Sequence, residues 1–312
     1  MRRTRSTNGS ISTNTTAPAR WRSSLQRCGE PRRMSSERSF VANDGTVIGY
    51  RQLGSGPGLV LLHGGLQSAA SFADLGAALA DRFTVIIPDR RGRGLSGPFR
   101  PDHCMATEIH DLGRLLAETG ARNVFALSSG ALVALHTALV NPAISRLALY
   151  EPPLEFGSVQ PRYWASNYEA ALTKKDLAAA FVAVVKGTGD NGIMTKLPAP
   201  VLRSFFAMVM RLRRDASAGD RPPLATLIPL VHYDIELIKE MAGDPDRYRS
   251  LGTKTLLLGG DRSQGYLKAG VDALTAILPN ATRIELKGTG HIAADNEGDP
   301  TRVAAELRRF FA

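Results

Sequence analysis

The stretch NVFALSSGALVAL, residues 123–135, places two serines and a glycine between two apolar runs. The first run has the length of a buried strand, and the second continues to residue 140, which is long enough for a buried helix. A strand that passes directly into a helix must turn sharply, and the residue at the turn is lifted above the sheet. The sequence therefore predicts a strand, a tight turn and a helix, with a serine at the apex.

The size of the flanking residues indicates which serine occupies the apex. Residues two positions before and two positions after the apex must be small, as in the pattern G-x-S-x-G. With Ser128 at the apex these residues are Ala126 and Gly130, and both are small. With Ser129 at the apex the first of them is Leu127, whose side chain should clash. We therefore predict that Ser128 is the candidate nucleophile, with alanine in place of the first glycine of the pattern.

Other apolar runs of strand length alternate with segments of helical pattern. The runs are LVLL (59–62), FTVIIPD (83–89), ISRLALYEPP (144–153), KTLLLGGD (254–261) and TRIELKG (282–288). Continuous apolar runs are typical of parallel strands buried on both faces, and an Asn-Asp-Gly turn in residues 39–54 indicates a preceding hairpin. Helices are expected at residues 72–79, 106–119, 131–140, 272–278 and 301–311. The alternation predicts an α/β fold with a doubly wound, mostly parallel sheet.

One long interval interrupts this alternation and predicts an inserted cap. Residues 154–230 contain no convincing strand and two helical stretches, so the core is expected at residues 39–153 and 231–312. Candidate residues for an apolar substrate pocket are Leu66, Trp164, Phe205 and Met208. The alternative for most residues of the second helical stretch, which includes Phe205 and Met208, is that they form the core face of that helix.

The basic charge of the chain is concentrated at its N-terminal end. Residues 1–38 carry nine arginines against two glutamates, which is +7 of the net charge of +10. This segment contains no nucleic-acid-binding motif, so we expect a disordered basic tail and no nucleic-acid partner.

Cysteine content and hydropathy exclude other classes of protein. The two cysteines, Cys28 and Cys104, form neither a CxxC pair nor a disulfide framework, so no metal site is expected. The sequence contains no run of about 18 apolar residues, so no membrane span is expected. No apolar stretch follows the arginine pair at residues 2–3, which argues against a secretory signal. We expect a cytoplasmic protein.

A serine nucleophile needs a base that removes its proton and an acid that orients the base. His291 lies in the glycine-rich loop GTGH, directly after the last predicted strand, and is the candidate base. Asp261 ends the strand TLLLGG and is the preferred acid, because the order Ser128, Asp261, His291 matches the known order for such a site. Glu151, which ends the next predicted strand after the one that leads to Ser128, is the alternative acid. The remaining histidines are interpreted as structural or surface residues: His63, His103, His110, His136 and His232.

Two backbone N–H groups are expected to form an oxyanion hole. One belongs to Ser129, at the positive end of the helix that follows the apex. The other is expected from the HGG loop after the first parallel strand, where glycines leave room for an incoming carbonyl. Gly65 is the first choice for this donor and Leu66 the second, while His63 is expected to brace the loop.

Together these motifs resemble the α/β-hydrolase superfamily, in its serine-nucleophile, esterase-like branch. The resemblance rests on LLHGG, PDRRGRGLSG, FALSSGAL, LALYEPP, TLLLGGD and GTGH, which follow the family's order within residues 39–312. It implies the α/β-hydrolase fold with a mostly parallel eight-stranded sheet, an acyl-enzyme mechanism and no cofactor. The loop at residues 89–97 is mainly structural in this family, so its arginines do not indicate phosphate binding.

Three functions agree with this pattern. The first is a serine hydrolase that acts on a small carboxylic ester or related acyl substrate. The second is a cofactor-free perhydrolase, lyase or carbon–carbon hydrolase that uses the same three residues. The third is a hydrolase-like sensor that binds a small molecule, although a complete set of catalytic residues favours an enzyme. The sequence indicates neither the physiological substrate nor the oligomeric state.

Overall fold

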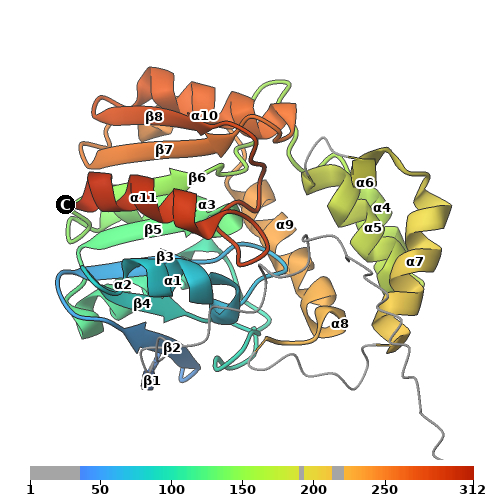
Figure 1. Cartoon of the computed structure of the whole chain (residues 1–312), viewed down its shortest axis with the longest axis horizontal. Helices are drawn as coiled ribbons and strands as arrows, with labels where there is room; N and C mark the ends of the chain where they lie inside the picture. The colour runs from blue at the N-terminus through green and yellow to red at the C-terminus, as the bar shows by residue number, and fades with distance from the viewer. Residues whose placement is uncertain (1–35, 190–192, 213–220) are drawn as a thin grey trace, which may run out of the picture. The chain divides into compact units, whose positions relative to one another are not determined.

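The computed structural model of the chain describes residues 36–189, 193–212 and 221–312. Its centre is an eight-stranded sheet with the order β1-β2-β4-β3-β5-β6-β7-β8 (Figure 1). The strands are β1 (Ser36–Val41), β2 (Val47–Leu53), β3 (Gly58–Leu62), β4 (Thr84–Pro88), β5 (Asn123–Leu127), β6 (Arg146–Tyr150), β7 (Lys254–Gly260) and β8 (Ala281–Leu286).

The pairing of the strands confirms the predicted sheet. The strands β3 to β8 pair in parallel, whereas β1 and β2 form an antiparallel hairpin and β2 pairs antiparallel with β4. Every residue of β5 is buried, as its continuous apolar sequence predicts. The six parallel strands end at one edge of the sheet, where the loops that carry the candidate site residues begin.

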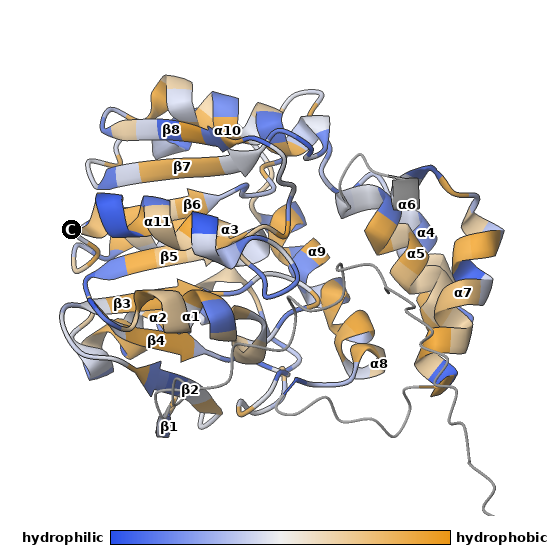
Figure 2. Cartoon of the chain, viewed as in Figure 1, coloured by the Kyte–Doolittle hydropathy of each residue, from blue (hydrophilic) through white to orange (hydrophobic). Residues whose placement is uncertain are grey.

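Helices cover both faces of the sheet. On one face α1 and α11 pack against each other, and on the other α2 packs against α3 (Figure 1). Two separate groups of buried apolar side chains fill these layers, and Figure 2 shows hydrophobic residues along β4 and β7. The helices of the core are α1 (Ala73–Leu79), α2 (Met105–Thr119), α3 (Ser129–Val140), α9 (Val231–Glu240), α10 (Gly265–Ile277) and α11 (Pro300–Phe311).

Two of these helices differ from the sequence-based expectation. The helix α10 begins seven residues before the expected start at residue 272, because Gly270 does not interrupt it. A side chain at Gly270 would press against the carbonyl oxygen of Pro152, at 3.1 Å, so the glycine serves close helix packing. The helix α9 was not predicted as a separate element, although it packs against α3.

The regular secondary structure that the structure describes in segment 154–230 is helical, apart from an isolated bridge between Phe156 and Val159, and turns and loops connect the helices. Its aromatic and aliphatic side chains form a third group of buried residues. Gln264 and Tyr266 of the core bond to carbonyl oxygens near the end of α5, at 2.8 and 3.2 Å. The helices are α4 (Ala165–Thr173), α5 (Leu177–Thr188), α6 (Ile193–Lys196), α7 (Ala199–Leu212) and α8 (Leu224–Leu227). We call residues 154–230 the cap segment, or cap; that this segment forms a domain of its own stays a prediction.

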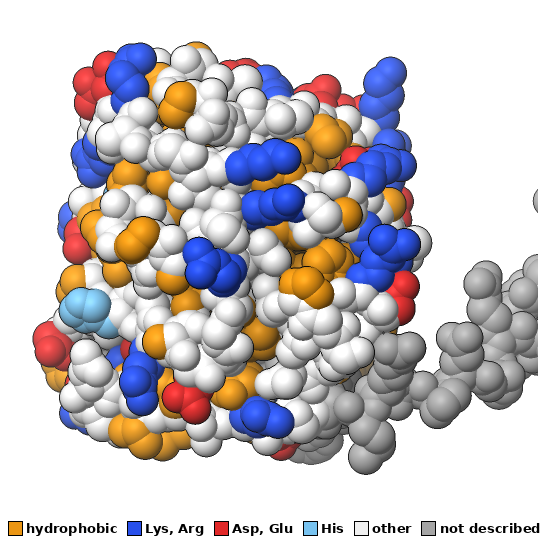
Figure 3. Space-filling model, turned by 90° about the vertical axis from the view of Figure 1, so that its left-hand side faces the viewer, with side chains coloured by type: hydrophobic (Ala, Val, Ile, Leu, Met, Phe, Trp, Pro, Cys, Tyr) orange, Lys and Arg blue, Asp and Glu red, His pale blue; other side chains and the backbone are white. Residues whose placement is uncertain are grey.

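Of the predicted tail, residues 1–38, the first 35 lie outside the described residues. Its last three residues belong to β1. Among the described residues, no helix has both the length and the apolar character to cross a bilayer. Figure 3 shows the face on the left-hand side of Figure 1, where the C-terminus lies. Lysine and arginine side chains on that face are interspersed with uncharged and apolar ones.

Candidate active site

The turn between β5 and α3 has the conformation of a nucleophile elbow. Ser128 lies between the last residue of β5 and the first residue of α3, with φ 57° and ψ −127°. Gly130 must be small, because a side-chain carbon there would lie 2.4 Å from the carbonyl oxygen of His63. Ala126 is fully buried, and its methyl group fills the small space that lies before the turn. The size argument thus placed the apex at the correct residue, and the Ser128 side chain is half-buried.

Backbone strain is concentrated around this turn. Leu66, Ser128 and Glu151 have positive φ values of 57°, 57° and 47°, and all three follow the carboxyl ends of neighbouring parallel strands. A positive φ is costly for a residue with a side chain and persists only where the surrounding structure enforces it. Such strain is typical of functional sites, and here it coincides with the predicted nucleophile.

His291 contacts both a serine and a carboxylate. Its Nε2 lies 3.0 Å from Ser128 Oγ, and its Nδ1 lies 2.7 Å from Glu151 Oε2. His291 is 6% exposed and Glu151 is fully buried. The carboxylate can therefore fix the Nδ1–H tautomer, which leaves Nε2 free to accept a proton from the serine.

The structure places Glu151, and not Asp261, beside the histidine, which corrects the sequence-based preference. β7 ends at Gly260, and Asp261 turns away from the sheet into solvent, where its carboxylate accepts the N–H of Gly288 at 2.7 Å. Glu151 instead points inward, and its Oε1 accepts the N–H of Gly260 at 2.7 Å. A side chain at Gly259 would lie 2.9 Å from that oxygen, so Gly259 makes room for the glutamate.

Hydrogen bonds hold the histidine loop against the loop that follows β3. Tyr150, at the end of β6, donates its hydroxyl to the carbonyl oxygen of Gly290 at 2.8 Å. Gln67 accepts the N–H of Gly64 at 2.9 Å and donates to Asp295 at 2.8 Å. The HGG loop is therefore connected by side chains to the loop that contains His291.

The residues of the two predicted oxyanion donors belong to segments that meet at the elbow. A side-chain carbon on Gly64 would lie 2.8 Å from Ser128 Cβ, so the HGG loop runs directly beside the serine. Gly65 and Leu66 follow in this loop, and Ser129 is the first residue of α3. The N–H groups of a helix's first turn have no partner within the helix and can bind an anion.

Four of the other histidines bond to, or contact, protein groups outside the serine–histidine–glutamate site. His63 Nδ1 lies 2.9 Å from the carbonyl oxygen of Gly64, and its Nε2 accepts the N–H of Arg90 at 3.1 Å. His136 bonds to the hydroxyl of Tyr248 at 2.8 Å. His232 and His103 contact the carboxylates of Glu169 and Glu108, at 2.8 and 3.4 Å. His110 is exposed on α2.

Acid should destabilise the protein through His63. Burial, aided by Arg93 and Arg90, lowers the pKa of this histidine from 6.5 to about 3. Between these values the unfolded chain binds a proton that the folded protein does not, so the stability gained from the neutral ring is lost as the pH falls. We expect a loss of about 2 kcal/mol between pH 7 and pH 5 from this group. Denaturant titrations at both pH values should show a smaller loss for His63→Gln, and an equal loss would contradict this cause.

The predicted pocket residues occupy three kinds of position. Trp164 is buried and packs edge-on against Tyr168, with ring centres 6.1 Å apart, so it belongs to the core of the cap. Phe205 and Met208 are 47% and 56% exposed on α7. Leu66 is partly buried and packs against the apolar core of the cap. Of the four residues, Leu66 is the one that directly follows the HGG loop in the sequence.

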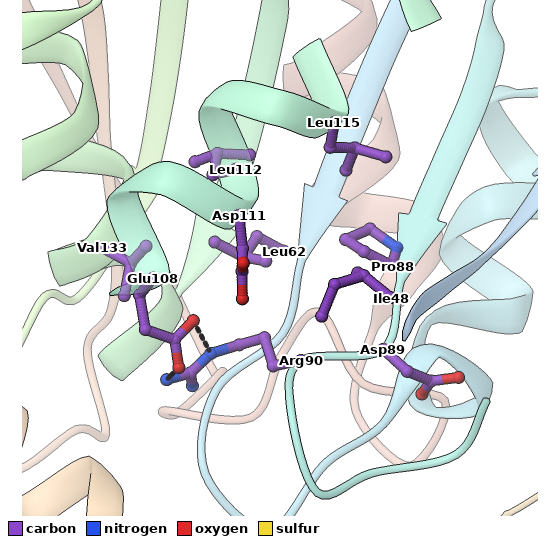
Figure 4. Close-up of a pocket in the computed structure, with 10 residues that line it drawn as sticks. All are labelled: Ile48, Leu62, Pro88, Asp89, Arg90, Glu108, Asp111, Leu112, Leu115 and Val133. Carbon is purple, nitrogen blue, oxygen red and sulfur yellow. Dashed lines mark hydrogen bonds and ion pairs between the residues drawn. The ribbon is translucent and has the colours of Figure 1, made fainter. Parts of the chain in front are cut away.

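A small cavity lies beside Arg90, between α2 and the sheet (Figure 4). Its volume is about 20 Å³, which is room for about one water molecule. The guanidinium of Arg90 and the carboxylate of Glu108 face each other at its edge. Ser128, Glu151 and His291 do not line this cavity, so it is not the substrate site.

Sequence reasoning missed a buried charged cluster next to the elbow. Asp234 on α9 bonds to Arg90 and Arg93 at 2.8 and 2.6 Å and accepts the Ser129 hydroxyl at 2.8 Å. The arginines belong to the loop that the family resemblance describes as structural, and their partner on α9 is distant in sequence. No pattern in the sequence indicated this pairing.

The sheet, the elbow and the serine–histidine–carboxylate geometry define the class as an α/β hydrolase. The chain belongs to the alpha/beta hydrolase family, which it matches over residues 59–306. Among the described residues, no group of three or more His, Cys, Asp or Glu side chains has the arrangement of a metal site.

Relatives of the chain include esterases. It is 28% identical to the pimeloyl-acyl-carrier-protein methyl ester esterase of Xanthomonas campestris pv. campestris, over 83% of this chain and 97% of the relative. The enzyme of the same name from Stenotrophomonas maltophilia is 27% identical, over 83% and 94%. Together with the family, these relatives support an esterase-like hydrolase.

Solved structures show the same fold. An alpha/beta hydrolase from Sphaerobacter thermophilus superposes with a TM-score of 0.70 and 28% identity, covering 88% of this chain and all of the other. The carboxylesterase CesB of Bacillus subtilis superposes with a TM-score of 0.62 at 20% identity, covering 89% and 92%. The second likeness concerns the fold alone.

Proposed function

We propose that the protein is a serine hydrolase that cleaves a small carboxylic ester, or a related acyl substrate, through an acyl-enzyme. The observation that carries the proposal is the continuous contact from Ser128 Oγ through His291 to Glu151, at 3.0 and 2.7 Å. These separations are those of a nucleophile, a general base and its orienting acid. The esterase relatives, which act on a methyl ester, support the same class of substrate.

The proposed reaction has two halves. Ser128 Oγ attacks the ester carbonyl while His291 Nε2 accepts the hydroxyl proton, and the histidine then gives that proton to the departing alkoxide. Glu151 holds the ring and stabilises its positive charge, and the N–H groups of Gly65 and Ser129 bind the oxyanion. A water molecule, deprotonated by His291, then hydrolyses the acyl-enzyme and restores the serine. Each proton is returned within the cycle, so no further reactant is needed.

Ester turnover and active-site labelling test this proposal. We expect the protein to hydrolyse at least one short p-nitrophenyl ester and to react with a fluorophosphonate probe at one serine. Mass spectrometry of the labelled protein should locate the adduct on the peptide that contains Ser128. Absence of both turnover and labelling in correctly folded protein would contradict a hydrolase. Labelling without ester turnover would instead favour the lyase, perhydrolase or carbon–carbon hydrolase alternatives.

A further inference from the structure

One buried carboxylate touches both residues that carry the proposed oxyanion donors. Asp234 Oδ1 accepts the hydroxyl of Ser129 at 2.8 Å. On its other side, a methyl group placed on Gly65 would lie 3.1 Å from Asp234 Oδ2. Asp234 thus lies between the HGG loop and the first residue of α3, with one oxygen directed to each.

Two arginines keep this carboxylate in place. Arg90 Nη1 bonds to Oδ1 at 2.8 Å and Arg93 Nη2 bonds to Oδ2 at 2.6 Å, and all three side chains are at least nine-tenths buried. Burial raises the pKa of Asp234, but the two guanidinium groups outweigh burial and the pKa is lowered. The carboxylate is therefore ionised and paired with two guanidinium groups, whereas an unpaired buried acid would favour its neutral form.

The charges of the cluster are balanced by a second carboxylate. Glu108 on α2 bonds to Arg90 at 2.7 and 3.1 Å, so two arginines face two acids. Glu108 contacts the cluster on the side away from Ser129, through Arg90, and a substituted Gly65 would meet Asp234 and not Glu108. The two acids thus share a charged environment but differ in their contact with the oxyanion residues.

We infer that Asp234 is a positioning residue that fixes the separation of the two oxyanion donors, Gly65 N–H and Ser129 N–H. This inference rests on the proposed function. The donors belong to two segments far apart in the chain, and an oxyanion is bound well only if both lie about 2.7–3.1 Å from it. Gln67 holds the loop at Gly64, and Asp234 packs against the following residue, Gly65, which has no side chain of its own. Asp234 lies on α9, the first core helix after the cap segment. The position of this helix therefore sets the geometry of the oxyanion hole.

The substitution Asp234→Asn tests the inference, with Glu108→Gln as the matched control. Both remove one buried negative charge from the same cluster, but only the first alters a group that contacts Gly65 and Ser129. We expect Asp234→Asn to lower kcat for a p-nitrophenyl ester by about 10²-fold, with KM within threefold of wild type. Its affinity for a trifluoromethyl ketone analogue should fall by the same factor as kcat/KM. Glu108→Gln should keep kcat within threefold of wild type, even if its melting temperature falls as much as that of Asp234→Asn.

Two results would overturn the inference. One is a kcat for Asp234→Asn within threefold of wild type, and the other is an equal fall in kcat for both variants. If Asp234→Asn does not fold, Gly65→Ala tests the same contact from the other side, because its methyl group must push the loop away from Asp234. A kcat for Gly65→Ala equal to that of wild type would also overturn it. Failure of the proposed function is distinct, since Ser128→Ala would then remain active.

Discussion

Replacing Ser128 with alanine is expected to lower kcat by about 10⁶-fold, the cost of removing the nucleophile in comparable enzymes. The hydroxyl is the group that bonds to the carbonyl carbon, and its oxygen lies 3.0 Å from His291 Nε2. Alanine preserves the small volume at the apex of the turn. Initial rates with a p-nitrophenyl ester, and labelling by a fluorophosphonate, should both fall to background.

Ser129→Ala is the control for this experiment. Ser129 keeps its backbone N–H when its side chain is shortened, and its hydroxyl bonds to Asp234 and Arg90 rather than to His291. We expect this variant to lose at most about 10²-fold in kcat, the effect of a displaced oxyanion donor, because its hydroxyl bonds to Asp234 while the nucleophile and its own N–H remain. Full fluorophosphonate labelling of Ser128→Ala, or loss of labelling in Ser129→Ala only, would show that the nucleophile is misassigned.

The sequence predicted the sheet and the turn at Ser128 because local signals determine both. A short, continuous apolar run such as β5 is typical of a strand buried on two faces. The elbow requires small residues at fixed distances from its apex, and Gly130 is constrained by the carbonyl of His63 in the way that argument assumes. Such constraints act between residues close in the chain or in adjacent strands, so the sequence contains them.

The acid could not be chosen from the sequence because two carboxylates follow strands at the same edge of the sheet. Glu151 and Asp261 differ in the direction of their side chains, which depends on the backbone after each strand. The positive φ at Glu151 turns its side chain inward, and Gly259 at the end of β7 provides the space. These features are properties of two strands packed together, and neither run of residues indicates them alone.

The Asp234 cluster was missed for a related reason. The hydroxyl of Ser129 and the carboxylate of Asp234 are separated by 105 residues, and the cap segment lies between them. A single aspartate on an amphipathic helix is typical of a solvent-exposed face. Only the packing of α9 against α3 makes it a buried partner of Arg90 and Arg93.

Glu151→Gln is expected to lower kcat by about 10⁴-fold, as the loss of the orienting carboxylate does in comparable relays. The amide keeps the size of the side chain and can still accept the N–H of Gly260. It cannot stabilise a positively charged His291, and its NH₂ group can hold the ring in the tautomer that has a proton on Nε2. Steady-state kinetics should show the loss in kcat, while the melting temperature reports whether the variant is folded.

Asp261→Asn provides the matched comparison, because it makes the same chemical change at the acid that sequence order favoured. Its carboxylate is exposed and bonds to the backbone of Gly288, so kcat should remain within threefold of wild type. A large loss for Asp261→Asn together with a small loss for Glu151→Gln would mean that Asp261 orients the histidine during turnover. That result would require the loop after β7 to move toward His291 when substrate binds. The opposite ranking follows directly if the 2.7 Å contact between Glu151 and His291 persists through the reaction.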